Sequence, residues 1–255
     1  MSGTVCVEVD DFVAVITIDR PAVRNAIDLE TACSIAAALD EADERSDVRS
    51  IVLTGSGETF CAGMDLKAFA ASGQRPITES RGAFGIVERP PDKPLIGAVE
   101  GKALGGGFEI ALACDVIVAA RTAAFGLPEV KRGLVAAAGG VLFLPQRIPF
   151  NIGMEMILTG EPITAARAAD LGLVNKVVDT GEATTAAITL ARSIGRNAPL
   201  AVQTAKRLAR AARDWRDVEA FDLQRPHTAV IRESRDAMEG ARAFVEKRPP
   251  QWVGA

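Results

Sequence analysis

Two glutamates are the residues best suited to chemistry in this chain of 255 residues. Glu109 lies within the apolar segment FEIALAC, residues 108–114, and Glu129 follows Pro128 in FGLPEVKRG. A carboxyl group among apolar residues needs a reason, because burial penalises its charged form. Two such groups around one substrate allow one to activate water while the other, protonated, gives a proton to carbon.

Each glutamate also has a purely structural interpretation. Glu109 falls in the first turn of a predicted helix, where a carboxylate stabilises the helix dipole. Glu129 lies close to Lys131 and Arg132, and a solvated loop acid is the simpler interpretation of that position taken alone. Position and residue type leave both interpretations open.

Backbone amides at two strand-to-helix junctions are the second candidate for chemistry. The glycines of residues 105–107 match neither the G-x-G-x-x-G nor the P-loop spacing, which argues against a phosphate cradle. Glycine nevertheless exposes its N–H group to a ligand oxygen, at a helix end that carries partial positive charge. Gly63, in FCAGMDLK, places the amide of Met64 at a similar junction. Two such donors make an oxyanion hole, although tight helix packing and an ordinary turn explain the same glycines.

Composition excludes several classes of function. The formal net charge is −4, and aromatic residues make up 5% with no Tyr, which argues against a nucleic-acid partner. Four cysteines without a CxxC pair and a single histidine, His227, predict no metal site. The sequence shows no secretory signal and no run of about 18 apolar residues, so we expect a cytoplasmic protein without a membrane partner.

The elements that must position these groups alternate between strand and helix. This alternation predicts an α/β core with parallel strands, whereas no strand pattern returns after Glu182. We expect a core at 1–195 that holds the active site and a helical region at 196–255. The predicted strands are 5–9, 12–18, 48–54, 94–101, 115–120 and 174–178. The predicted helices begin after an N-cap at Asp28 and include 65–71, 108–114, 139–146, 151–159, 164–171, 183–196, 200–212, 218–232 and 234–246.

Three segments in this order resemble the enoyl-CoA hydratase/isomerase (crotonase) superfamily. They are FCAGMDLK at 60–67, IGAVEGKALGGGFEIALACDVIVAA at 96–120 and FGLPEVKRG at 125–133. The similarity extends nearly end to end, and each segment alone is weak evidence. The resemblance implies the crotonase-like ββα superhelix, a spiral core followed by a helical C-terminal region.

The resemblance also assigns roles to the residues above. It implies that Glu109 acts as the base on water, that Glu129 delivers a proton to C2, and that Met64 and Gly106 donate the oxyanion-hole N–H groups. Because both acids are present, the implied reaction is reversible hydration of a 2-enoyl-CoA thioester. Coenzyme A is then part of the substrate, and no separate cofactor is implied.

The family's coenzyme A site and assembly carry over in the same way. The substrate-binding positions implied are Ala26, Ala62, Asp65, Leu66 and Lys67, with Phe244 and Lys247 closing the site, often from a neighbouring subunit. The implied assembly is a homotrimer or a homohexamer built as a dimer of trimers, with the C-terminal helices in the contacts.

Departures from the family pattern make some reactions of the family less compatible with this sequence but do not single out one reaction. Ala136 and Ala137 stand where many hydratases have Pro-Gly, and Leu127 replaces a common polar residue, which makes the pocket more apolar. Several segments resemble the carnitinyl-CoA dehydratase branch, but aromatic residues are too few for a quaternary-ammonium cage. Carnitinyl-CoA dehydration, enoyl-CoA isomerisation and a non-catalytic acyl-CoA-binding protein remain the alternatives.

Overall fold

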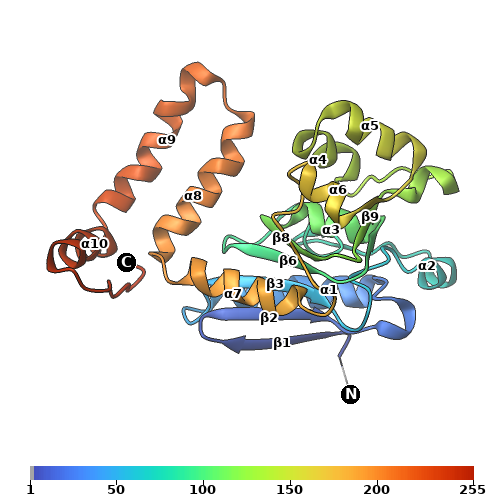
Figure 1. Cartoon of the computed structure of the whole chain (residues 1–255), viewed down its shortest axis with the longest axis horizontal. Helices are drawn as coiled ribbons and strands as arrows, with labels where there is room; N and C mark the ends of the chain where they lie inside the picture. The colour runs from blue at the N-terminus through green and yellow to red at the C-terminus, as the bar shows by residue number, and fades with distance from the viewer. Residues whose placement is uncertain (1–2) are drawn as a thin grey trace.

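The computed structural model describes residues 3–255 and contains a six-stranded sheet in the order β1-β2-β3-β6-β8-β11 (Figure 1). β1 and β2 pair antiparallel, and every later pair in this sheet is parallel. The six strands span, in that order, Val5–Asp10, Val13–Ile18, Ser50–Gly55, Leu95–Val99, Val116–Ala120 and Lys176–Val178. All six were predicted from their β-branched residues; residues 1–2 of the expected core lie outside the described part.

A smaller sheet turns the fold into a spiral. It pairs β10 (Ile163–Thr164), β9 (Ala124–Gly126) and β7 (Lys102–Leu104). One turn of the spiral is β6, β7 and helix α3 (Gly106–Ala113); the next is β8, β9, the 3-10 helix η2 (Pro128–Arg132) and α4 (Gly140–Arg147). The preceding turn is β3, a bridge from Cys61 to Ala103, and α2 (Leu66–Ser72).

The sequence did not predict the short strands of the smaller sheet. The expected strand 94–101 ends at Val99, and β7 then enters the other sheet. β10 begins where helix 164–171 was expected, so that helix, α6, is shortened to Ala165–Asp170. Strands of two or three residues are too short to show alternation, so only pairing with a partner strand defines them. The same holds for β4 (Ile77–Thr78) and β5 (Gly82–Ala83), which form a separate ribbon.

Apolar residues cover both faces of the large sheet. On one face, α1 (Leu29–Glu44) and α3 pack over a core that includes Ile51 and Phe108. On the other face, Val52 packs against α7 (Ala183–Gly195), which presents an alanine every fourth residue: Ala183, Ala187 and Ala191. The small side chains let α7 lie close to the strands. Asp28 caps α1 as predicted, since its Oδ1 accepts the N–H of Thr31 at 2.9 Å.

The last helices extend away from the sheets (Figure 1). α8 (Pro199–Ala211), α9 (Asp217–Arg232) and α10 (Arg235–Glu246) follow one another, with the 3-10 helix η3 (Ala212–Asp214) after α8. Their predicted bounds are correct to within one residue. The remaining elements are η1 (Pro21–Val23) and α5 (Phe150–Thr159). Among residues 3–255, no helix combines the length and the apolar character needed to cross a membrane.

Candidate active site

Successive turns of the spiral bring the two predicted backbone donors together. A Cβ on Gly63 would lie only 2.9 Å from the nitrogen of Gly106, so the two junctions are in direct contact. The bridge between Cys61 and Ala103 holds the loops at this separation. In the described part of the chain, neither the Met64 N–H nor the Gly106 N–H has a hydrogen-bond acceptor. Both donors are therefore available to a ligand oxygen.

Close packing explains the glycines as well. A Cβ on Gly106 would overlap the ring of Phe84, and one on Gly107 would overlap the carbonyl of Cys61. Gly105, just before α3, has φ of +56°, which glycine adopts without strain. The two interpretations of the cluster are thus compatible, because the packing that requires glycine also fixes the direction of the Gly106 amide.

Glu109 is buried in an apolar surrounding, with only 3% of its surface exposed. Its Oε1 accepts a hydrogen bond of 2.9 Å from the N–H of Gly140, the first residue of α4. Leu127 and Ala136, both buried, pack around Gly140 and complete the apolar wall. Burial raises the pKa of Glu109 to about 7, and the nearby charge of Glu129 adds to this effect. The Gly140 hydrogen bond opposes the rise in pKa but does not cancel it.

Glu129 belongs to η2, and its side chain lies beside the glycine turn that begins α3. A Cβ on Gly105 would lie 2.9 Å from Oε1 of Glu129, so this carboxyl group sits beside the start of α3. Its Oε2 is buried and has no hydrogen-bond partner among residues 3–255. Burial raises the pKa of Glu129 as well. The two carboxyl groups therefore border one glycine-rich site, and both are poised to hold a proton closer to neutral pH than ordinary glutamates.

The predicted coenzyme A positions of the N-terminal half lie beside the Met64 junction. The Ile27 N–H donates to the Gly63 carbonyl and the Asp65 N–H to the Ile27 carbonyl, each at 2.8 Å. This pairing places Ala26, which is nearly buried, next to the exposed Ala62. Leu66 and Lys67 are exposed in the first turn of α2. These four positions form one continuous border of the site.

Asp65 has a structural task that the resemblance did not indicate. Its Oδ1 accepts the N–H groups of Lys67 and Ala68, each at 3.1 Å, and so caps α2. Its Oδ2 forms an ion pair of 3.2 Å with Arg20, which also pairs with Asp28. The carboxylate of Asp65 is thus occupied in holding α2 and the 20–28 loop in place.

Phe244 and Lys247 are not brought to this site within one chain. They belong to the end of α10, at the opposite end of the molecule from α2 (Figure 1). Phe244 is 85% exposed, and Lys247 ends the helix with φ of +54°.

Comparison with known proteins decides the family. The model of the enoyl-CoA hydratase/isomerase family matches residues 8–255. The chain belongs to the enoyl-CoA hydratase/isomerase family. The crotonase-type α/β spiral expected from the sequence is thereby confirmed.

Individual members of this family are similar over nearly the whole chain. Enoyl-CoA hydratase EchA19 of Mycobacterium tuberculosis is 40% identical over 247 residues, covering 93% of this chain and 92% of the relative. A carnitinyl-CoA dehydratase of Salmonella enteritidis is 42% identical over 247 residues, or 94% of each protein. The crystal structure of enoyl-CoA hydratase EchA1 from Mycobacterium marinum is 50% identical, covers both chains fully and superposes with a TM-score of 0.97.

Three residues of this family member escaped the sequence interpretation. Gly140 binds Glu109, and the Gly139-Gly140 pair before a helix was the only available signal. Phe84, with φ of +56°, holds its ring against Gly106, and nothing in its neighbourhood in the sequence indicates this contact. Arg75 is exposed, and its positive charge lowers the pKa of Glu109, which partly offsets the effect of burial.

Cys61 beside the site and Cys114 at the far end of α3 are both buried and poorly suited to act as nucleophiles. Burial raises the pKa of the Cys61 and Cys114 thiols to about 12. A thiol is nucleophilic as its thiolate, so these residues serve as small apolar side chains, as predicted.

Proposed function

We propose that this protein is an enoyl-CoA hydratase, a hydro-lyase that adds water across the 2,3 double bond of a 2-enoyl-CoA thioester. One observation carries the proposal: two carboxyl groups with raised pKa border the site where two adjoining junctions each present an unpaired backbone N–H group. Family membership supports the same class of reaction. Acyl-CoA binding alone would need neither acid, which argues against a non-catalytic binding protein.

In the proposed reaction, the thioester oxygen accepts hydrogen bonds from the N–H groups of Met64 and Gly106. Glu109 removes a proton from water as the water oxygen bonds to C3 and the π electrons move toward the thioester oxygen. The oxyanion hole stabilises this enolate, with each donor contributing about 3 kcal/mol in comparable sites. Glu129 then gives its proton to C2. One water molecule is added in total, so the reaction needs no separate cofactor.

The coenzyme A portion is proposed to lie along the border formed by Ala26, Ala62, Leu66 and Lys67. Asp65 contributes by fixing that border rather than by direct contact. Phe244 and Lys247, at the end of α10, lie far from α2 in one chain, and we propose that they contribute to the coenzyme A site of a neighbouring subunit. A homotrimer, alone or as a dimer of trimers, accounts for the exposed apolar side chains of the last helices: Val218, Phe221, Val230, Met238, Phe244 and Val245.

Carnitinyl-CoA dehydration is the second candidate. It uses the same pair of acids in the reverse direction, and the name of the Salmonella relative favours it. The paucity of aromatic residues argues against it, since no Tyr is available to surround a quaternary ammonium group.

An assay with purified full-length protein tests the proposal. The protein is incubated with 2-enoyl-CoA thioesters of increasing chain length, with a 3-enoyl-CoA and with carnitinyl-CoA, and the products are separated by chromatography. We expect loss of the ultraviolet absorbance of the conjugated thioester and formation of a 3-hydroxyacyl-CoA. Migration of the double bond without hydration would show an isomerase, and an unchanged conjugated thioester at every chain length would contradict the proposed activity.

A further inference from the structure

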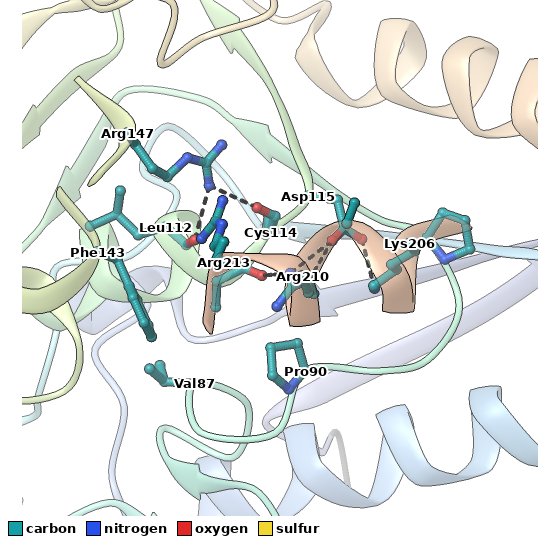
Figure 2. Close-up of a pocket in the computed structure, with 13 residues that line it drawn as sticks. Val87, Pro90, Leu112, Cys114, Asp115, Phe143, Arg147, Lys206, Arg210 and Arg213 are labelled. Atoms are coloured by element: carbon teal, nitrogen blue, oxygen red, sulfur yellow. Dashed lines mark hydrogen bonds and ion pairs between the residues drawn. The ribbon is translucent and has the colours of Figure 1, made fainter. Parts of the chain in front are cut away.

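A cleft of about 320 Å³ lies at the opposite end of α3 from Gly106. Its walls come from the last residues of α3, from α4, from α8 and η3, and from the segment before β6 (Figure 2). None of the residues that line it was assigned to catalysis or to coenzyme A binding above. Its distinguishing property is its charge.

Basic side chains outnumber acidic ones in this cleft by four to one. The lining includes Arg147, Lys206, Arg210 and Arg213, with Asp115 as the only acid. Asp115 is fully occupied, because it pairs with Lys206 at 2.6 Å and with Arg210 at 2.7 Å. Its Oδ2 also accepts the Leu95 N–H at 2.8 Å. Lys206 and Arg210 thus share a single carboxylate, which neutralises only one positive charge, and the other two cations have no carboxylate at all.

Arg147 and Arg213 have no carboxylate partner among the described residues. Arg147 donates through one nitrogen, Nη1, to the carbonyls of Leu112 and Cys114 at 3.0 and 2.9 Å. Its remaining N–H groups have no acceptor within residues 3–255. The side chain of Arg213 makes no hydrogen bond to the described chain, and it extends toward Arg147 in Figure 2. Burial lowers the pKa of Arg147, and the like charges of Arg213 and Arg210 lower it further.

Arg147 is half-buried in the cleft and Arg213 is exposed at its edge. Their guanidinium groups repel each other, and water screens this repulsion less well on the half-buried side than at the open surface. An oxygen-bearing anion between them removes this repulsion and matches the planar donor pattern of arginine. We propose that the cleft binds an anionic group, a carboxylate or a phosphate, between Arg147 and Arg213.

Such a group has two possible sources: a free small anion, or the far end of the acyl chain bound in the active site. The second source rests on the proposed function. It is supported by shared walls, because Leu112 lies one turn beyond Glu109 on α3 and lines the cleft. Val87 and Phe143, also in the lining, both lie against Gly139, next to the Gly140 that binds Glu109. An acyl chain would have to pass between these two apolar side chains to reach the cationic end of the cleft.

Isothermal titration calorimetry with full-length protein tests the anion site directly. Inorganic phosphate and succinate are titrated into the wild type, R213Q and R207Q. Arg207 is the matched control, since it is exposed on α8, six residues before Arg213, and lies outside the lining. We expect R213Q to weaken binding at least fivefold, R213E to abolish it, and R207Q to change it less than twofold. Absence of binding to the wild type, or equal affinities of R213Q and R207Q, would overturn the proposal.

Kinetics distinguish the two sources. A 2-enoyl-CoA that ends in a carboxylate is compared with one of equal length that ends in a methyl group. A preference for the carboxylate that falls about fivefold in R213Q identifies the acyl end as the ligand. Equal rates together with calorimetric binding identify a free anion. If neither thioester is hydrated, the proposed function fails, while calorimetry still decides the anion site.

Discussion

The two ends of helix α3 contrast sharply, although the helix is only eight residues long. At its first turn, glycine packing exposes the Gly106 amide, and the carboxyl groups of Glu109 and Glu129 lie alongside. At its last turn, Arg147 and Arg210 donate to the carbonyls of Leu112, Ala113 and Cys114. Acids collect at the positive end of the helix dipole and bases at its negative end, as electrostatics favours.

The comparison shows that charged side chains do different things at the two ends of α3: acids at the first turn can exchange protons, and ion pairs at the last turn hold elements together. At the first turn the carboxyls lack strong ionic partners, so burial raises their pKa and keeps them able to exchange protons. At the last turn Asp115 joins α8 to the core through ion pairs. Changes at the first turn should therefore act on turnover, and changes at the last turn on stability.

The largest expected effect is loss of turnover when either acid is replaced. Glu109→Gln and Glu129→Gln should each lower kcat by about 10²- to 10⁴-fold, because general acid–base catalysis contributes that much. The rate is followed by the absorbance of the conjugated thioester. Glu155→Gln, an exposed change on α5, is the control and should keep full activity. Full hydratase turnover in either acid variant would refute the assigned roles.

Replacing the oxyanion-hole glycine should have the next largest effect. Gly106→Ala places a Cβ against the Phe84 ring and tilts the amide, so kcat should fall by about 10²-fold. Phe84→Ala combined with Gly106→Ala makes room for the new methyl group and should recover part of the rate. Absence of any recovery would show that the ring does not control the amide direction.

The buried carboxyl of Glu109 should make stability depend on pH. Its pKa of about 7 lies above the 4.5 of an unperturbed glutamate, so the folded state binds more protons between these values. The free energy of unfolding should therefore fall as pH rises from about 4.5 to 7, by up to about 3 kcal/mol.

Urea unfolding at a series of pH values measures this dependence. Glu109→Gln, which keeps an oxygen for the Gly140 N–H, should match the wild type at pH 4 and exceed its stability at pH 8. Glu155→Gln should follow the wild type throughout. Parallel curves for Glu109→Gln and the wild type would show that Glu109 has an ordinary pKa.

The smallest expected effect is at the last turn of α3. Asp115→Asn leaves Lys206 and Arg210 without their carboxylate in a partly buried position and should cost about 2 kcal/mol of unfolding free energy. Turnover per folded molecule should change less than twofold. Asp170→Asn, a change outside any ion pair of the described chain, is the control. A selective loss of kcat in Asp115→Asn would break the proposed division between the two ends.

The sequence predicted the elements that carry a local signal. The apolar, β-branched runs marked the six strands of the large sheet, and Asp28 marked the start of α1. The glycines of 105–107 and the acids Glu109 and Glu129 were found because their residue types are unusual for their surroundings.

The remaining features depend on partners far away in the chain. The ion pair of Asp65 involves Arg20, 45 residues earlier, and the ring that requires glycine at 106 belongs to Phe84. The raised pKa of Glu109 depends on burial under Leu127, Ala136 and Gly140, all from later turns of the spiral. No local pattern records such contacts, and they appear only when the fold is known.

The spiral has a consequence for how new reactions arise on this frame. Met64 and Gly106 occupy equivalent points of successive turns, so the pitch of the backbone, and no side chain, sets the spacing of their amides. Side chains that do not touch the two junctions can be exchanged without changing that spacing. If the amide pair holds a carbonyl oxygen as proposed, a change of reaction on this frame would fall to the positions around it, above all 109 and 129.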